Sequence, residues 1–295
     1  MHVAVLGAGT MGHGIAQVSA MAGHDVSLRD VDETIVADGV DAIDENLQGG
    51  VQRDKVTPAE REDALDRIEG TTDLAAAASD ADLVVEAVPE DVELKQNVLG
   101  EAANVAPDDA VLASNTSSLP VTEIAAALDE PGRFVGLHFF NPVHIMALVE
   151  VVVAEQTSDE TLAFATEFVE GIEKTPIEVA DSPGFASSRL GVSLGVEAMR
   201  MLQEDVASPR DVDQAMELGY NHPMGPVELG DVVGLDVRLD ILEHLREELG
   251  ERFRPPQILK RKVRAGKLGE KTGEGFYVWE DGEIVGTSDD WGDSA

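Results

Sequence analysis

The chain has 295 residues and no cysteine, and its 58 acidic residues outnumber 21 basic ones, giving a formal net charge of −37. This acidic excess would repel phosphate backbones and anionic lipid surfaces, so we expect neither a nucleic-acid partner nor a membrane partner. The lack of cysteine excludes disulfides, zinc–thiolate sites and thiol catalysis. Apolar residues make up 43% of the chain, enough for one large or two medium cores.

The same charge predicts the surroundings in which the protein works. Carboxylates at this density repel one another, and at about 1 M salt a Debye length of roughly 3 Å removes most of that repulsion. We therefore expect a cytoplasmic protein of a salt-accumulating organism, with a highly acidic mesophilic protein as the alternative. The chain opens on a strand-like segment, which predicts no signal peptide, and no apolar run reaches the ~18 residues of a membrane span.

Strands and helices alternate from the first residues onward. Short β-rich apolar runs predict strands at 2–6, 25–30, 81–90, 110–118, 133–140, 147–154 and 175–181. Helices are expected at 10–23, 94–106 and 161–172 and within the acidic stretch 31–67, where "TPAERE" marks a helix start at Thr57 and Pro58. This alternation predicts an α/β fold with a doubly wound, mostly parallel sheet.

The pattern changes after "DSPGF" (181–185), because only helical stretches are expected from 186 to about 264. We therefore expect an α/β domain at 1–182, a smaller all-α domain at 183–282, and an acidic tail at 283–295. Small residues in "RLGVSLGVEAM" suit close helix packing at a dimer interface, although an ordinary core helix would look similar.

A glycine-rich turn, "VLGAGTMGHGIA", joins the first strand to the first helix. Gly7, Gly9 and Gly12 form G-x-G-x-x-G, which suits a tight turn, close approach of a pyrophosphate, and packing of the helix on the strand. The loop also contains Met11, and the helix N-terminus offers free N–H groups to phosphates. Asp30 ends the next strand and can accept hydrogen bonds from an adenosine ribose, which favours NAD over NADP. A glycine-rich turn without a ligand is the alternative.

Three polar clusters follow later strands: "VEAVPE" (85–90), "SNTSS" (114–118) and His138. Ligands of parallel sheets bind at the carboxyl ends of the strands, so we expect these clusters to converge near the glycine loop. A histidine titrates near neutral pH and suits the base that an alcohol oxidation requires. Glu150 could orient and support it if their two strands pair. A satisfied core histidine is the alternative for His138.

A hydroxyl within "SNTSS" could donate a hydrogen bond to a substrate oxygen. Ser117 is the candidate, although Ser114 and Ser118 are equivalent on physical grounds, and each could simply cap a turn. No metal is expected, because the remaining histidines lack metal-ligand spacing; these are His2, His13, His24, His144, His222 and His244.

Eight motifs carry a resemblance to a known family. They are "GAGTMGHGIAQ", "VVEAVPE", "LASNTSSLP", "GLHFFNPV", "LVEVV", "DSPGF", "NHPMGPVELGD" and "KTGEGFY". In this order the chain resembles the L-3-hydroxyacyl-CoA dehydrogenase family, particularly its bacterial 3-hydroxybutyryl-CoA dehydrogenase branch. The resemblance implies a Rossmann-type NAD-binding domain, a helical domain that forms a homodimer, and reversible NAD-linked oxidation of an L-3-hydroxyacyl-CoA to the 3-ketoacyl-CoA.

The resemblance also implies roles for individual residues. His138 matches the general base, Glu150 its carboxylate partner, and Ser117 the serine that holds the substrate oxygen. Asn141, in "HFFNP", lies beside the site in the family, and Glu90 and Lys95 match positions near the nicotinamide half of the cofactor. Without the resemblance, Glu90 and Lys95 would be interpreted as a helix-entry charge and a solvated lysine.

The chain departs from the family pattern at two places that concern the substrate. Ser188, in "PGFASSRL", stands where the family carries an asparagine. Serine has one hydroxyl for hydrogen bonding, whereas the asparagine amide has a separate donor and acceptor. In "NLQGGVQRDKV", Arg53 and Lys55 remain for the CoA phosphates, but Gly49 and Gly50 occupy positions where a lysine is common. A dehydrogenase of a non-CoA hydroxy acid and a non-enzymatic NAD-binding protein are therefore the alternatives.

Overall fold

The computed structural model describes residues 1–288, and the chain divides into two units between Phe185 and Ala186. The expected boundary, between 182 and 183, lies three residues from this division. The difference is small because "DSPGF" forms the end of the first unit, where Phe185 is buried in a core of that unit.

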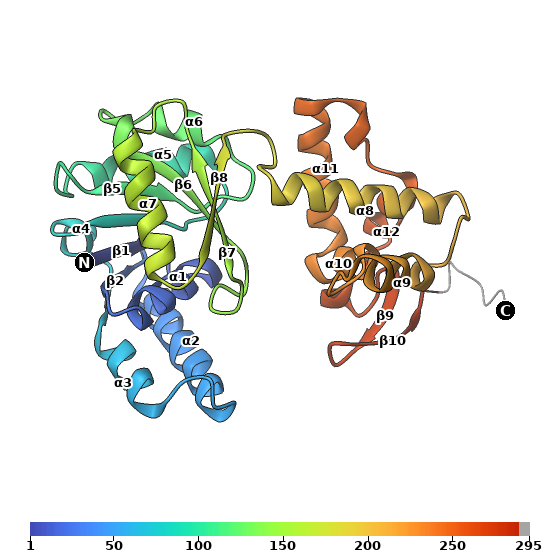
Figure 1. The fold of residues 1–295 in the computed structure, drawn as a ribbon, viewed down its shortest axis with the longest axis horizontal. Coiled ribbons are helices and arrows are strands. Elements are labelled where there is room, and N and C mark those ends of the chain that lie inside the picture. The colour runs from blue at the N-terminus through green and yellow to red at the C-terminus, as the bar shows by residue number, and fades with distance from the viewer. Residues whose placement is uncertain (289–295) are drawn as a thin grey trace. The chain divides into compact units, whose positions relative to one another are not determined.

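The first unit contains an eight-stranded sheet in the order β3-β2-β1-β4-β5-β6-β7-β8 (Figure 1). All neighbouring strands run parallel except β6 and β7, which are antiparallel. The strands are β1 (His2–Leu6), β2 (Asp25–Arg29), β3 (Ile68–Thr71), β4 (Leu83–Glu86), β5 (Val111–Ser114), β6 (Phe134–Phe139), β7 (Leu148–Val153) and β8 (Thr175–Ala180). The predicted doubly wound sheet is confirmed, although β3 was missed because its sequence, IEGT, is not an apolar run and none of its residues is fully buried.

Helices cover both faces of this sheet, since alternate residues of β1 enter two different cores. Val3 and Val5 belong to one cluster and Ala4 and Leu6 to the other. The helices are α1 (Thr10–Met21), α2 (Glu33–Gln52), α3 (Pro58–Asp66), α4 (Leu74–Ala78), α5 (Val92–Ala103), α6 (Val121–Ala125) and α7 (Asp159–Gly171).

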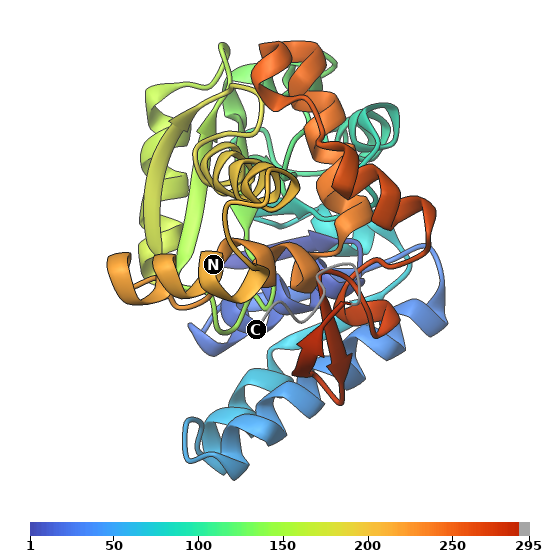
Figure 2. The same cartoon turned by 90° about the vertical axis from the view of Figure 1, so that its right-hand side faces the viewer.

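Helices α2 and α3 form a hairpin that projects from one end of the sheet (Figures 1 and 2). The helix start expected at Thr57 is confirmed. The Thr57 hydroxyl accepts a hydrogen bond from the Glu60 amide, and the Glu60 carboxylate accepts one from the Thr57 amide, which is a capping box. The turn of this hairpin carries Arg53 and Lys55.

The second unit is helical, as expected, but it also contains one hairpin of strands (Figure 2). Its helices are α8 (Ser187–Gln203), α9 (Pro209–Tyr220), α10 (Pro226–Val233), α11 (Leu235–Leu249) and α12 (Gln257–Arg264), and its strands are β9 (Tyr277–Glu280) and β10 (Glu283–Thr287). None of the helices within residues 1–288 is long and apolar enough to cross a bilayer.

The hairpin corrects two expectations: the second unit is not purely helical, and residues 283–287 do not belong to an acidic tail. The turn between the strands is Asp281-Gly282, and both residues have positive φ, 49° and 81°. An Asp-Gly pair is a strong hairpin signal, so the sequence did contain it. The rest of the expected tail, 289–295, lies outside the described residues.

Candidate active site

The glycine loop turns the chain from β1 into α1 under tight steric limits. Gly7 has φ +110°, and a Cβ atom there would lie 2.6 Å from the carbonyl oxygen of Ala87. A Cβ atom on Gly12 would overlap the carbonyl oxygen of Gly7, so α1 can pack on the turn only with glycine here. A Cβ atom on Gly9 would meet nothing within 4 Å, which leaves that part of the backbone open.

The N-terminus of α1 suits a dinucleotide. Its N-cap, Gly9, makes no side-chain cap, and its first turn contains no acidic residue, so the positive end of the helix dipole is not neutralised there. Asp30 follows β2, and its carboxylate accepts hydrogen bonds from the amides of Ala8 (2.8 Å) and Val31 (2.7 Å). Asp30 therefore joins the end of β2 to the glycine loop, while Met11 packs against the core beside it.

The polar clusters after β4 and β5 do converge. One carboxylate oxygen of Glu90 accepts hydrogen bonds from the Thr116 hydroxyl (2.5 Å) and the Ser117 amide (3.0 Å). The side-chain oxygen of Asn115 accepts a hydrogen bond from the Phe139 amide (3.1 Å), which connects the same loop to β6 next to His138. The expected convergence within this unit is thus confirmed by contacts.

The three candidate serines are not equivalent in the structure. Ser114 is fully buried and donates to the Glu86 carboxylate at 2.5 Å, so its hydroxyl is already engaged. Ser118 is half-buried, and its amide donates to the Thr116 hydroxyl. Ser117 is exposed, with its hydroxyl 3.4 Å from Glu90. Of the three, Ser117 is the most exposed.

Lys95 is fully buried, so its interpretation as a solvated lysine is wrong. Its ammonium lies 2.8 Å from the carboxylate of Glu86, which is also fully buried, and 3.4 Å from that of Glu90. Sequence reasoning missed Glu86. The available signal was a single charge inside the apolar strand "LVVEAV", nine residues before a lysine on the following helix.

His138 and Glu150 are opposite one another in the antiparallel pair β6–β7. The Nδ1 atom of His138 lies 2.6 Å from a carboxylate oxygen of Glu150, and the two residues are 6% and 0% exposed. The imidazole ring also contacts Phe140, at 4.4 Å between ring centroids, and Phe185, at 5.8 Å. The pairing that the sequence required for an acid–base couple is present.

The remaining expected residues lie in loops of the first unit or in the second unit. Asn141 is exposed two residues after β6, Arg53 follows the last residue of α2, and Lys55 is exposed in the α2–α3 turn. In the described part of the chain, none of these three is hydrogen-bonded to His138 or Ser117. Ser188 is half-buried in the first turn of α8, in the second unit.

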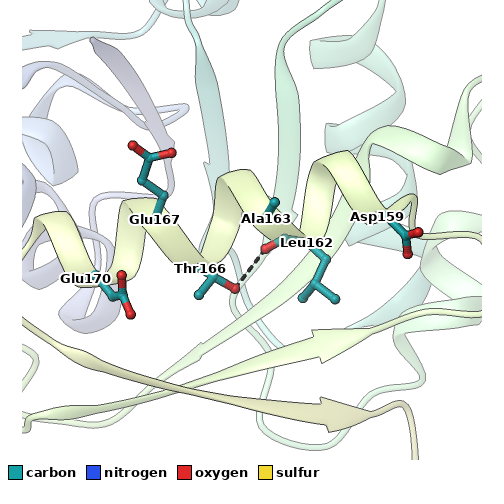
Figure 3. Close-up of a pocket in the computed structure, with 6 residues that line it drawn as sticks. All are labelled: Asp159, Leu162, Ala163, Thr166, Glu167 and Glu170. Carbon is teal, nitrogen blue, oxygen red and sulfur yellow. Dashed lines mark hydrogen bonds between the residues drawn. The ribbon is translucent and has the colours of Figure 1, made fainter.

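A separate hollow of about 750 Å³ lies along α7 and contains none of the expected site residues (Figure 3). It is lined by Asp159, Leu162, Ala163, Thr166, Glu167 and Glu170, and the Thr166 hydroxyl is hydrogen-bonded to the carbonyl oxygen of Leu162 at 2.8 Å. Three carboxylates in this lining would repel the phosphates of a dinucleotide or of CoA, so the hollow does not compete with the glycine loop as the cofactor site.

Comparison with known proteins agrees with this geometry. The NAD-binding domain of 3-hydroxyacyl-CoA dehydrogenase matches residues 2–182, and the C-terminal domain of the same family matches residues 184–279. A probable 3-hydroxybutyryl-CoA dehydrogenase of Deinococcus radiodurans is 45% identical over 280 residues, covering 95% of this chain and 100% of that protein.

Solved structures give the same result. The (S)-3-hydroxybutyryl-CoA dehydrogenase PaaH1 from Ralstonia eutropha has a TM-score of 0.91 at 40% identity, covering 95% of this chain and 99% of that one. FadB2 of Mycobacterium tuberculosis has a TM-score of 0.90 at 43% identity, covering 94% and 98%. The chain therefore belongs to the 3-hydroxyacyl-CoA dehydrogenase family, whose members are NAD-dependent oxidoreductases.

Proposed function

We propose that this chain catalyses the reversible, NAD-linked oxidation of an L-3-hydroxyacyl-CoA, with 3-hydroxybutyryl-CoA as the expected substrate. The observation that carries the proposal is the His138–Glu150 pair, at 2.6 Å, in the same unit as the glycine loop and Ser117. An acid–base couple, a dinucleotide loop and an accessible hydroxyl are the groups that alcohol oxidation requires.

His138 is the general base in this proposal. With its Nδ1–H donated to Glu150, the neutral imidazole carries its lone pair on Nε2, and in the described part of the chain Nε2 has no hydrogen-bond partner. Nε2 takes the proton of the substrate hydroxyl as the carbonyl bond forms, and Glu150 stabilises the resulting imidazolium. This tautomer is the one expected when an ionised carboxylate, which can only accept a hydrogen bond, faces Nδ1.

Ser117 holds the reacting oxygen, and the glycine loop holds the cofactor. The Ser117 hydroxyl donates to the substrate oxygen, where negative charge grows as its proton leaves. Bound NAD supplies the acceptor for the hydride that leaves the substrate carbon. The open backbone at Gly9, the uncapped start of α1 and the carboxylate of Asp30 fit its pyrophosphate and ribose.

Basic groups near the α2–α3 turn support CoA as the carrier of the acyl group. Within residues 1–288, Arg53 and Lys55 have no carboxylate partner, although the chain carries 58 acidic residues. Burial lowers the pKa of His144, and the positive charges of Arg53, Lys174 and His13 lower it further. The charges of Arg53 and Lys174 therefore lie in one region of the first unit, as phosphate groups would require.

The test is NADH oxidation in molar KCl with acetoacetyl-CoA, compared with free acetoacetate at equal concentration. The proposal expects turnover of the thioester and at least about a hundredfold lower kcat/KM for the free acid, because the free acid lacks the CoA phosphates. Equal use of both substrates would favour the non-CoA hydroxy acid dehydrogenase. No turnover of any thioester, with NADH still bound, would favour a non-enzymatic NAD-binding protein.

The matched variant for the CoA contact is Arg53→Gln. It should raise KM for acetoacetyl-CoA several-fold and leave kcat and the affinity for NADH unchanged, because one exposed charge pair contributes about 1 kcal/mol or less. A proportional loss of kcat would contradict a role limited to the phosphates.

Three further properties belong to the proposal: salt dependence, cytoplasmic location and dimerisation. The net charge of −37 supports the first two. A melting temperature that is the same in dilute buffer and in molar KCl would contradict the salt dependence. For dimerisation, the packed helices α8 and α10 expose Leu190, Leu194, Val232 and Val233. Sedimentation in molar KCl should show a dimer, and a monomer would contradict it.

A further inference from the structure

Glu86 is a buried charge that the proposed reaction does not use. It ends β4 with no exposed surface. One carboxylate oxygen accepts from the Lys95 ammonium (2.8 Å) and the Val88 amide (2.6 Å), and the other accepts from the Ser114 hydroxyl (2.5 Å). Burying a carboxylate is costly, and this set of donors offsets that cost by satisfying both oxygens.

Lys95 connects Glu86 to the loops that follow β4 and β5. Besides Glu86, its ammonium donates to the carbonyl oxygens of Val88 (3.2 Å) and Asn115 (3.1 Å) and forms an ion pair with Glu90 at 3.4 Å. Val88 follows β4 and Asn115 follows β5. The ammonium therefore joins the two loops at the edge of the sheet where ligands bind.

The same connection reaches both proposed binding elements. Glu90 holds the Ser117 amide at 3.0 Å, so Ser117 is linked to Glu86 through Glu90 and Lys95. Gly7 lies against Ala87 and Val88, the two residues that follow Glu86, and the Val88 amide is bonded to Glu86. A change at Glu86 therefore acts on the glycine loop as well as on Ser117.

The network also has a net charge. Glu86 and Glu90 each contribute −1 and Lys95 contributes +1. These three residues, at the edge of the sheet where β4 and β5 end, therefore carry −1 in total. Burial raises the pKa of Glu86, and the charge of Lys95 and the three hydrogen bonds oppose that rise and favour the ionised form. The oxidised nicotinamide ring is a cation and the reduced ring is neutral, so a net negative edge favours the oxidised cofactor.

We infer that Glu86 is a positioning residue, which holds Lys95, Glu90 and Ser117 in place and sets the negative charge by which the site favours the oxidised cofactor over the reduced one. This inference rests on the proposed function for the location of the nicotinamide. Glu86 touches neither substrate nor cofactor in this account; it acts through Lys95 and Glu90.

The test compares dissociation constants of NAD⁺ and NADH, measured by fluorescence titration of the full chain in molar KCl. Glu86→Gln keeps the shape of the side chain and makes the edge neutral, so the Kd for NAD⁺ should rise at least about threefold relative to the Kd for NADH. Lys95→Met makes the edge −2 and should shift the ratio in the opposite direction. An unchanged ratio in either variant would overturn the inference.

The double variant Glu86→Gln/Lys95→Met separates charge from position. It restores the net charge of −1, so the NAD⁺/NADH ratio should return to that of the unmodified protein. The connection to Glu90 and Ser117 is still lost, so kcat with acetoacetyl-CoA should remain at least about tenfold low. A full recovery of kcat would contradict the positioning role. If Glu86→Gln does not fold, Lys95→Met still tests the effect of charge on the NAD⁺/NADH ratio. The double variant still tests the effect of position on kcat.

Asp231→Asn is the matched control, because Asp231 is another fully buried carboxylate that accepts three hydrogen bonds, but in the second unit. It should lower the melting temperature without changing the NAD⁺/NADH ratio. A ratio that moves as much as in Glu86→Gln would mean that general destabilisation explains the effect, and would overturn the inference. Because these titrations need no turnover, a failure of the proposed activity remains distinguishable.

Discussion

Both units bury carboxylates, but they hold them with different kinds of donors. In the first unit, Glu150 faces the imidazole of His138 and Glu86 faces the ammonium of Lys95. In the second unit, Asp231 accepts hydrogen bonds from the amides of Phe276 and Tyr277 and from the indole of Trp279. Asp213, also in the second unit, accepts from two amides and the Tyr277 hydroxyl.

The difference lies in whether the partner of the carboxylate is a titratable or charged side chain. Imidazole gains and loses a proton near neutral pH, and a buried ammonium contributes a full charge to its surroundings. Backbone amides and an indole keep their protons, so they fix the chain without taking part in a reaction. Removal of charge should therefore reduce turnover in the first unit and stability in the second.

The largest expected effect concerns His138. His138→Gln should lower kcat with acetoacetyl-CoA by about 10²–10⁴-fold, because the proton of the alcohol then has no positioned acceptor. The measurement is steady-state NADH oxidation in molar KCl, with the Kd for NADH as the control that the cofactor site is intact. Unimpaired turnover would remove His138 from the mechanism.

The matching change in the second unit is Asp231→Ala. It leaves three buried donors without an acceptor and should lower the free energy of unfolding by about 3–5 kcal/mol. Equilibrium unfolding in molar KCl measures this loss. The kcat per folded molecule should stay within about twofold. A loss comparable to that in His138→Gln would contradict the difference between the units.

The smallest effect concerns pH and the half-buried histidines of the first unit. Burial lowers the pKa values of His13, His24 and His144, and nearby positive charges lower those of His24 and His144 further. The unfolded chain, with histidine pKa values of about 6.5, then binds more protons than the folded one. Stability should therefore be fully present above about pH 6.5 and decline as the pH falls below it.

The variant that checks this slope is His144→Gln, with unfolding measured between pH 7.5 and 5.5 in molar KCl. It should flatten the decline relative to the unmodified chain. A slope that stays the same would show that His144 is not the group that titrates, and an opposite slope would contradict the direction given for its pKa.

Much of the first unit could be predicted from the sequence, because its elements have local signals. The glycine loop, the Thr57 capping box and the apolar strands are each defined by a few neighbouring residues. The His138–Glu150 contact followed once β6 and β7 were expected to pair, since a strand register determines which residues face each other.

The missed features depend on contacts between distant segments. Glu86 looked like one more polar residue at a strand end, because its burial and its three donors come from other elements. Ser114 and Ser117 could not be distinguished for the same reason, since only packing engages one hydroxyl and exposes the other. The β9–β10 hairpin is different, because its Asp-Gly turn was visible in the sequence.

The most direct test of the central claim is a double-mutant cycle on His138 and Glu150. If the two residues work as one acid–base couple, each single Gln variant lowers kcat by about 10²-fold or more, and the double variant is no slower than the slower single one. Steady-state kinetics with acetoacetyl-CoA in molar KCl gives all four values. If the two losses multiply in the double variant, His138 and Glu150 act independently, and the account is wrong.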